Sequence, residues 1–294
     1  MDFINRSRPD SVALETTLPA MGLPAGEGLP FCRELDGIIA EEGGTPTTIG
    51  VLGGRPIVGM TGDELASLLD GRRVEKANTA NLGVLVHREV DAATTVSTTM
   101  ELASLAGVRL FATGGIGGVH RGYAQHLDIS ADLAALARFP VAVVASGTKS
   151  LLDVTATREA LETLGVPCVG FGTDRFPAFY LSTNPDADSV LDARFDDERE
   201  LAEFLDAELT RTGRGVLVCN PIPEADEIDR SDWDRWLVGA QERAAGAAGR
   251  DITPAILGAL HEISDGATLR ANLALVRANA RLAARLARAL PSRT

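Results

Sequence analysis

The sequence predicts an α/β protein, an α/β/α sandwich with a largely parallel central sheet. Short runs of apolar and β-branched residues alternate with longer segments of helical spacing, which is typical of a sheet covered by helices on both faces. Several of the short runs lack polar residues, which indicates strands buried on both sides, as in parallel sheets. With 294 residues, 45% of them hydrophobic, the chain can bury a large core, so we expect a single domain over residues 1–294.

The first part of the chain predicts six strands and three helices. Two apolar runs joined by Gly53-Gly54 indicate a hairpin, and the stretch from Thr61 to Glu64 indicates a helix that starts with a capping box. The expected strands cover residues 11–14, 47–52, 55–60, 74–76, 82–87 and 108–112. Three helices are expected. The first covers residues 30–42, the second begins at residue 61, and the third follows the segment 92–96 and ends at residue 106.

The second part predicts three more strands and a series of helices. Ser130 has the side chain and the position of a helix cap, and Pro254 stands in a first turn, where its missing N–H does no harm. The aromatic residues in the segment 174–180 are expected in the core. The expected strands cover residues 141–145, 167–171 and 215–219. The expected helices cover residues 130–138, 155–164, 196–210, 231–247 and 269–289, with one more opened by Thr253-Pro254.

Composition narrows the range of partners. The net charge of −13 argues against nucleic acid and anionic membranes. No apolar run is long enough to span a bilayer, and the first 19 residues lack the features of a signal peptide, so we expect a cytoplasmic protein. Cys32, Cys168 and Cys219 are odd in number and lie in apolar contexts, which predicts reduced core thiols rather than disulfides or a zinc site.

Lysine occurs only at Lys76 and Lys149, and the other 26 basic residues are arginine. Lys149 follows a buried strand and the turn Ser146-Gly147-Thr148, at the edge where open α/β sheets bind ligands. Arginine cannot serve as an amine nucleophile, whereas a lysine can form a Schiff base with a carbonyl. We therefore interpret Lys149 as a candidate nucleophile and Lys76 as a second functional cation. Chance survival of two lysines in an arginine-rich chain is the alternative.

Other polar residues also follow predicted strands. Glu15 ends the first strand, although by itself it is typical of a solvated turn. Thr113 opens a run with four glycines in five residues that continues to His120 and Arg121, and such a run can bring backbone amides together around an anion. Asp128 and Asp132 bracket Ser130; they either complement the helix dipole or belong to a site. Asn272, on one face with Asn279, either ties helices together or reaches a ligand.

These motifs closely resemble the pseudouridine-5'-phosphate glycosidase family, which also contains the indigoidine synthase A-like proteins. The resemblance covers nearly the whole chain and rests on runs that are specific in combination. They are A-L-E-T-T from Ala13, K-A-N from Lys76, A-T-T-V from Ala93, F-A-T-G-G-I-G-G-V-H-R-G from Phe111, D-I-S-A-D-L from Asp128, S-G-T-K-S from Ser146, F-P-A-F-Y from Phe176, N-P-I-P from Asn220 and A-N-L-A-L-V from Ala271.

The resemblance implies an indigoidine synthase A-like fold and a reversible cleavage of pseudouridine 5'-phosphate to uracil and ribose 5-phosphate, usually by a homotrimer. It implies that Lys149 is the nucleophile, forming a Schiff base with C1' of the opened ribose, that Glu15 is the proton donor, and that Asp128 binds one divalent cation, Mn²⁺. Further residues correspond to positions that contact the substrate or lie near it: Lys76, Val96, Ser130, Ala131, Asp132, Thr113, His120 and Asn272.

The required chemistry agrees with these residue types. The leaving atom is carbon, so an iminium next to the bond provides the electron sink that simple acid catalysis lacks, and a carboxylic acid must move protons. The chain departs from many relatives at residues 21–25 and 77–81, where the acceptor could be selected. Asn78 and Asn81 could hydrogen-bond the edge of uracil. Two alternatives are a synthase that joins ribose 5-phosphate to another aromatic carbon nucleophile and a catalytically silent sugar-phosphate-binding protein.

Overall fold

The structure is a computed structural model that describes residues 2–70, 73–184, 189–246 and 252–291. Its described strands form one largely parallel sheet in the order β1-β4-β3-β2-β7-β8-β11-β9-β10; β6 also pairs with β3, and β5 pairs with β6. Among the strands in the described ranges, only the pairs β3–β4 and β3–β6 are antiparallel. The strands are β1 Ile4–Asn5, β2 Ser11–Leu14, β3 Thr45–Leu52, β4 Arg55–Val58, β5 Glu75–Ala77, β6 Ala92–Thr94, β7 Leu110–Ala112, β8 Ala142–Ala145, β9 Cys168–Phe171, β10 Ala193–Phe195 and β11 Val216–Cys219.

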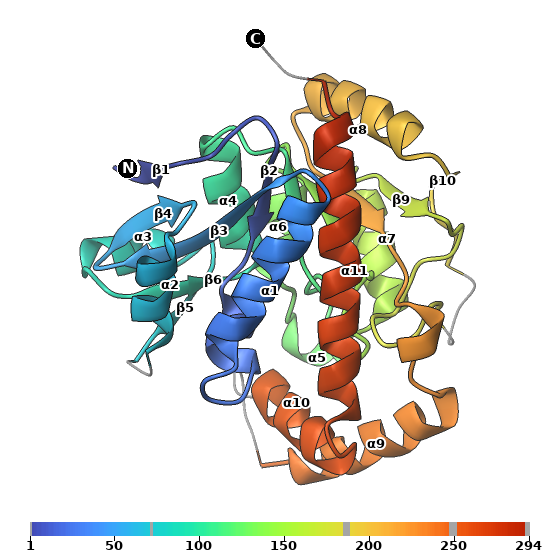
Figure 1. Cartoon of the computed structure of the whole chain (residues 1–294). Helices are drawn as coiled ribbons and strands as arrows, with labels where there is room; N and C mark the ends of the chain where they lie inside the picture. The colour runs from blue at the N-terminus through green and yellow to red at the C-terminus, as the bar shows by residue number, and fades with distance from the viewer. Residues whose placement is uncertain (1, 71–72, 185–188, 247–251, 292–294) are drawn as a thin grey trace.

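Helices cover both faces of this sheet, which confirms the predicted α/β class. Figure 1 shows α1 and α11 side by side across one face, while α4 and α6 lie behind the sheet. The helices are α1 Gly28–Glu41, α2 Gly62–Leu69, α3 Leu82–His87, α4 Val96–Leu105, α5 Tyr123–His126, α6 Ala131–Leu136, α7 Val154–Thr163, α8 Glu198–Thr212, α9 Arg230–Arg243, α10 Ile252–Ile263 and α11 Ala267–Ala289, with a π-helix at Leu18–Gly22 and a 3₁₀ turn at Glu224–Asp226. No helix in the described ranges is both long and apolar enough to cross a membrane.

Most of the predicted elements are present. β3 and β4 form the expected hairpin around Gly53-Gly54, and Thr61 and Glu64 form a complete capping box at the start of α2. The central strands β2, β7, β8 and β11 are buried along their whole length, as runs without polar residues indicate. The cysteines are free and buried, and Phe176, Phe179 and Tyr180 lie in the core.

The expected strand at residues 82–87 is wrong, because this segment is the helix α3. Leu82 and Leu85 are buried, whereas Gly83 and Val84 are exposed, a spacing of three that suits one helix face. A six-residue apolar run carries too little periodicity to separate a helix from a strand. The short edge strands β1 and β10 were not expected at all, since two or three residues give no pattern.

Strand register brings the predicted site residues to one edge. Leu14 of β2 pairs with Ala112 of β7, Ala112 pairs with Val144 of β8, and Ala145 pairs with Cys219 of β11. The residues that follow these strands therefore emerge at the carboxyl edge of a parallel sheet, where α/β proteins commonly bind ligands. They are Glu15, Thr113, Ser146 and Asn220.

Candidate active site

Glu15 and Thr113 are neighbours at the carboxyl edge, and the Thr113 hydroxyl donates a hydrogen bond to Oε1 of Glu15. The pKa of Glu15 is raised above its ordinary value of 4.5, first by burial and to a lesser degree by the charge of Asp132. The positive charge of Lys149 and the hydrogen bond from Thr113 act in the opposite direction. Glu15 is therefore predisposed to hold a proton, as a proton donor must.

Lys149 belongs to a loop that is tightly fixed. Gly147 has φ +71°, and a Cβ on it would lie 1.9 Å from the carbonyl oxygen of Pro177, so only glycine fits here. The Thr148 hydroxyl and the Lys149 N–H both donate to the carbonyl of Ile116, at 3.1 and 3.2 Å. The half-buried Lys149 thus extends from a rigid backbone, next to the glycine run.

Lys76 lies in β5, the strand that the sequence predicts for it. It is exposed to solvent, but nearby protein displaces enough water to lower the pKa of its ammonium, and the like charge of Lys149 lowers that pKa further. Asp132 and Glu15 act in the opposite direction. The two lysines and two carboxylates therefore interact as one cluster, although β5, β2, α6 and the loop after β8 are far apart in sequence.

Asp132 is buried and binds backbone amides. Its Oδ1 accepts from the Ser97 N–H at 3.0 Å, and its Oδ2 accepts from the Gly117 N–H at 2.8 Å. A Cβ on Gly117 would lie 2.3 Å from Oγ of Ser130, so the glycine permits close packing. The glycine run thus supplies the Gly117 amide to the carboxyl group of Asp132. Its other amides include that of Ile116, which binds the carbonyl of Gly147.

Ser130 has the predicted capping role, because its hydroxyl accepts from the Asp132 N–H at 3.2 Å. Ala131 follows it as the first residue of α6. Val96 is buried as the first residue of α4, next to Ser97, whose amide binds Asp132. These residues therefore lie around one carboxylate, and Asp132 does more than complement a helix dipole.

His120 and Asp128 form a more exposed pair at the edge of the site. Their side chains are 3.6 Å apart, from Nδ1 to Oδ2, and the His120 N–H donates to the Asp128 carbonyl at 3.0 Å. Within the described ranges, no three residues of the types His, Cys, Asp and Glu cluster as a metal centre. The donor set here is one exposed carboxylate, which fits a hard cation that keeps most of its water rather than a zinc ion.

The remaining predicted residues are less connected. The Oδ1 atom of Asn272 lies 3.1 Å from where a Cβ on Gly114 would stand, so this residue faces the glycine run. Asn81 accepts from the Asn78 N–H at 2.8 Å and donates to the Lys76 carbonyl at 3.0 Å. The Asn81 amide thus makes one hydrogen bond at each of its two polar atoms within its own loop, and its contact with uracil stays a prediction.

Sequence reasoning missed the role of Asn279. Its side chain is fully buried in α11 and donates to the carbonyl of Thr113 at 2.7 Å, while Asn220 donates to its Oδ1 at 2.9 Å. The only signal in the sequence was that Asn279 lies seven residues after Asn272, on the same apolar face.

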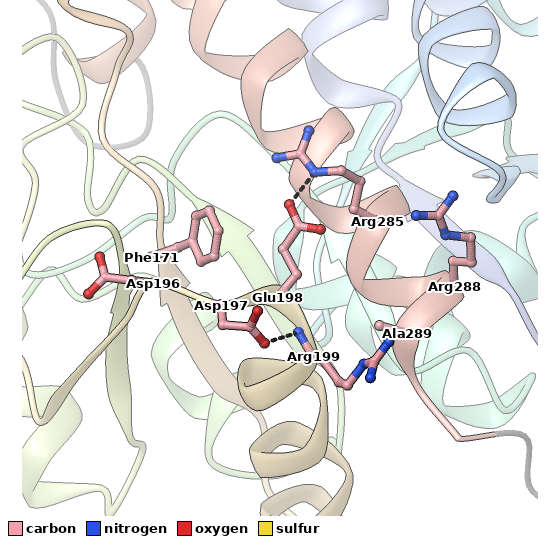
Figure 2. Close-up of a pocket in the computed structure, with 8 residues that line it drawn as sticks. All are labelled: Phe171, Asp196, Asp197, Glu198, Arg199, Arg285, Arg288 and Ala289. Carbon is pink, nitrogen blue, oxygen red and sulfur yellow. Dashed lines mark hydrogen bonds and ion pairs between the residues drawn. The ribbon is translucent and has the colours of Figure 1, made fainter.

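A separate hollow of about 700 Å³ contains none of the predicted site residues. Figure 2 shows it between the first turn of α8 and the last turns of α11. Charges of both signs line it, and the Arg285 Nε lies 2.5 Å from the Glu198 carboxylate. We therefore place the candidate active site at the lysine cluster, where the strand ends and the interacting charges coincide.

Comparisons with known proteins identify the family and the fold. The family model described as indigoidine synthase A like protein matches residues 3–289. A pseudouridine-5'-phosphate glycosidase of Nocardioides sp. is 46% identical over 94% of this chain and 90% of that protein. A protein of the same name from Deinococcus radiodurans is 43% identical over 97% of this chain and 90% of its own length.

Two solved structures share the fold. An indigoidine synthase A-like protein from Thermotoga maritima superposes with a TM-score of 0.88 at 34% identity, covering 97% of this chain and 95% of that one. The prealnumycin C-glycosynthase AlnA, solved in complex with ribulose 5-phosphate, superposes with a TM-score of 0.86 at 32% identity, covering 96% and 91%.

Proposed function

Because the chain belongs to the indigoidine synthase A-like family, and its curated relatives are named pseudouridine-5'-phosphate glycosidases, we propose that it is a C-glycosidase. It reversibly cleaves the carbon–carbon glycosidic bond of pseudouridine 5'-phosphate to give uracil and ribose 5-phosphate. The observation that carries this conclusion is the identity of 46% over 94% of the chain. The interacting cluster of two lysines and two carboxylates supports it.

In the synthetic direction, we assign the first step to Lys149. Its neutral amine adds to the C1' aldehyde of open-chain ribose 5-phosphate, and loss of water leaves an iminium at C1'. C5 of uracil then attacks C1', and the electrons of the C=N bond return to nitrogen. The proton lost from C5 passes to the lysine nitrogen. The C4' oxygen then attacks C1', the C1'–N bond breaks to release the neutral lysine amine, and the C4' hydroxyl gives up its proton as the ring closes. Cleavage follows the same steps in reverse and consumes one water.

Glu15 is the group that moves protons in this scheme. In the cleavage direction it protonates the ring oxygen as the lysine amine adds to C1', and in the synthetic direction it takes that proton back as the ring closes. Its raised pKa favours the protonated form that cleavage requires. Lys76 offers a positive charge to the phosphate, and Thr113, His120, Asn272 and the residues around Asp132 complete the substrate pocket.

Asp128 is the residue that we assign to a divalent cation of the manganese type. Such an ion, when bound, supplies positive charge for oxygen atoms of the substrate. We further propose a homotrimer that acts in the cytoplasm; the family resemblance supports the trimer.

Turnover of purified protein with pseudouridine 5'-phosphate and Mn²⁺ tests the function, with uracil release measured by chromatography. Borohydride reduction in the presence of ribose 5-phosphate, followed by peptide mass spectrometry, tests the nucleophile. We expect the adduct on Lys149 and no turnover in Lys149→Arg. An adduct on Lys76, or full activity of Lys149→Arg, contradicts the assignment.

The similarity to AlnA favours one second candidate, a synthase that joins ribose 5-phosphate to a different aromatic carbon nucleophile. Both candidates predict the Lys149 imine, so the acceptor decides between them. Incubation with ribose 5-phosphate and uracil forms pseudouridine 5'-phosphate if the glycosidase assignment is correct. If the imine forms but no C-nucleotide appears, the synthase assignment replaces it.

A further inference from the structure

Asn279 connects α11 to the ends of three central strands. Its Nδ2 lies 2.7 Å from the carbonyl of Thr113, 3.3 Å from that of Gly114 and 3.2 Å from Oγ of Ser146. Its Oδ1 accepts from Asn220 at 2.9 Å. Thr113 follows β7, Ser146 follows β8 and Asn220 follows β11, so one buried side chain contacts all three strand ends. In Figure 1, α11 crosses the middle of the sheet, as this role requires.

The chemistry of these neighbours fixes the orientation of the amide. The NH₂ group of Asn279 donates to the carbonyl of Thr113, and it also lies within reach of the carbonyl of Gly114, which accepts from the Ser146 N–H as well. Asn220 must therefore donate to the remaining oxygen. Aspartate at this position would face two carbonyls with a carboxylate, and leucine would remove the Asn279 donor from the Thr113 carbonyl. The site thus requires an amide, rather than any polar residue.

Two of the residues that hydrogen-bond to Asn279, Thr113 and Ser146, also hold the candidate acid and the candidate nucleophile in place. Thr113, whose carbonyl binds Asn279, uses its hydroxyl to bind Glu15. Ser146 opens the fixed loop that ends at Lys149, and its own N–H binds the carbonyl of Gly114 at 2.9 Å. A displacement of Asn279 would therefore move Thr113, which binds Glu15, relative to the loop that carries Lys149.

We propose that Asn279 is a positioning residue that fixes Thr113 and the loop from Ser146 to Lys149 relative to each other, and so sets the geometry between acid and nucleophile. This inference rests on the catalytic roles assigned above. Asn279 lies in the layer behind the site and reaches the reaction only through Thr113 and Ser146.

The test compares Asn279→Leu with Leu282→Ala. Leu282 is a buried residue of the same helix, one turn away, and its truncation weakens helix packing without removing these hydrogen bonds. For Asn279→Leu we expect kcat to fall by about tenfold or more with little change in KM, because a displacement of about 1 Å can cost on the order of 10²-fold. Leu282→Ala, matched for loss of stability by urea unfolding, should keep kcat per folded molecule.

A second readout does not depend on turnover. Infrared difference titration can follow the carboxyl group of Glu15, identified by its disappearance in Glu15→Gln. Lys149, Lys76 and Asp132 are the charged groups that face it, and all three are retained in Asn279→Leu. If Thr113 shifts away, the pKa of Glu15 rises by roughly one unit, since a hydrogen bond to a charged group is worth about that much.

A double-mutant cycle then decides whether Asn279 acts through Thr113. In a Thr113→Val background, Asn279→Leu should no longer change the pKa of Glu15. An unchanged pKa and kcat in Asn279→Leu would overturn the proposal, as would equal effects in both backgrounds. If Asn279→Leu does not fold, Asn279→Ser, which keeps one short donor, should give a smaller shift of the same sign. Failure of wild-type turnover with a normal Glu15 titration would count against the function alone.

Discussion

Replacing Thr113 with valine tests the electrostatics of the candidate acid most directly. Thr113 is buried, and valine replaces the hydroxyl by a methyl group of similar size, so Thr113→Val removes the donor with little change in volume. The hydroxyl bonds Oε1 of Glu15 and lowers the pKa of that carboxyl. Burial and the charge of Asp132 raise the pKa of Glu15. Without the hydroxyl, one of the groups that lower this pKa is lost, so the pKa must rise.

The magnitude follows from the strength of a hydrogen bond to a charged group, about 1.5–3 kcal/mol. One pKa unit corresponds to about 1.36 kcal/mol, so the expected rise is roughly one to two units. Lys149 and Lys76 still stabilise the carboxylate in the variant, which makes the lower part of this range the better expectation. A proton donor with a higher pKa stays protonated to higher pH, so the basic limb of the pH–rate profile for cleavage moves upward.

The assay is the pH dependence of kcat for cleavage of pseudouridine 5'-phosphate, together with infrared titration of the Glu15 carboxyl. Thr47→Val is a matched control, because Thr47 is a buried threonine whose hydroxyl bonds Ser11 at 2.7 Å, away from the carboxyl edge. Thr47→Val should leave the pKa of Glu15 in place. A Glu15 pKa that stays constant or falls in Thr113→Val would refute the reasoning.

Three further predictions concern the rest of the site. Asp128→Ala should lose the binding of Mn²⁺, measured by electron paramagnetic resonance, while still forming the borohydride-trapped imine; unchanged Mn²⁺ affinity would contradict the assignment. Asn81→Ala should raise KM by up to roughly 30-fold, because the two hydrogen bonds that fix the Lys76 loop are each worth about 1 kcal/mol. A direct uracil contact predicts instead a selective loss of uracil addition with imine formation intact. Lys149→Met should raise the pKa of both Glu15 and Lys76, measured by infrared titration and by the pH dependence of Lys76 acylation.

The sequence was sufficient to predict the carboxyl edge of the sheet. Continuous apolar runs identify the central strands, and parallel register places the residues that follow them side by side. Thr113 and Lys149 were singled out from their positions after such runs, whereas Glu15 was assigned through the family resemblance, because its position alone is typical of a solvated turn. Lys76 was singled out because it is one of only two lysines in a chain whose other 26 basic residues are arginine.

The partners of polar side chains could not be predicted in this way. The sequence shows that glycine amides can bind an anion, but not that the anion is Asp132, which lies 15 residues away. The amides of Asn81 and Asn279 bind carbonyls whose positions depend on tertiary structure. A carbonyl is present at every residue, so no sequence pattern marks the ones that are used.

In Lys149→Met, the direction in which the pKa values of Glu15 and Lys76 shift distinguishes loss of the Lys149 charge from a change in burial. Lys149 lowers the pKa of Glu15 by attraction and lowers that of Lys76 by repulsion, so removing its charge raises both. Loosening of the site would instead admit water, which lowers the pKa of a buried carboxyl and raises that of an ammonium that nearby protein had partly shielded from water. A parallel rise therefore identifies Lys149 as the shared electrostatic partner. Opposite shifts would show that the variant had only opened the site, and no shift would show that the three groups do not interact in solution.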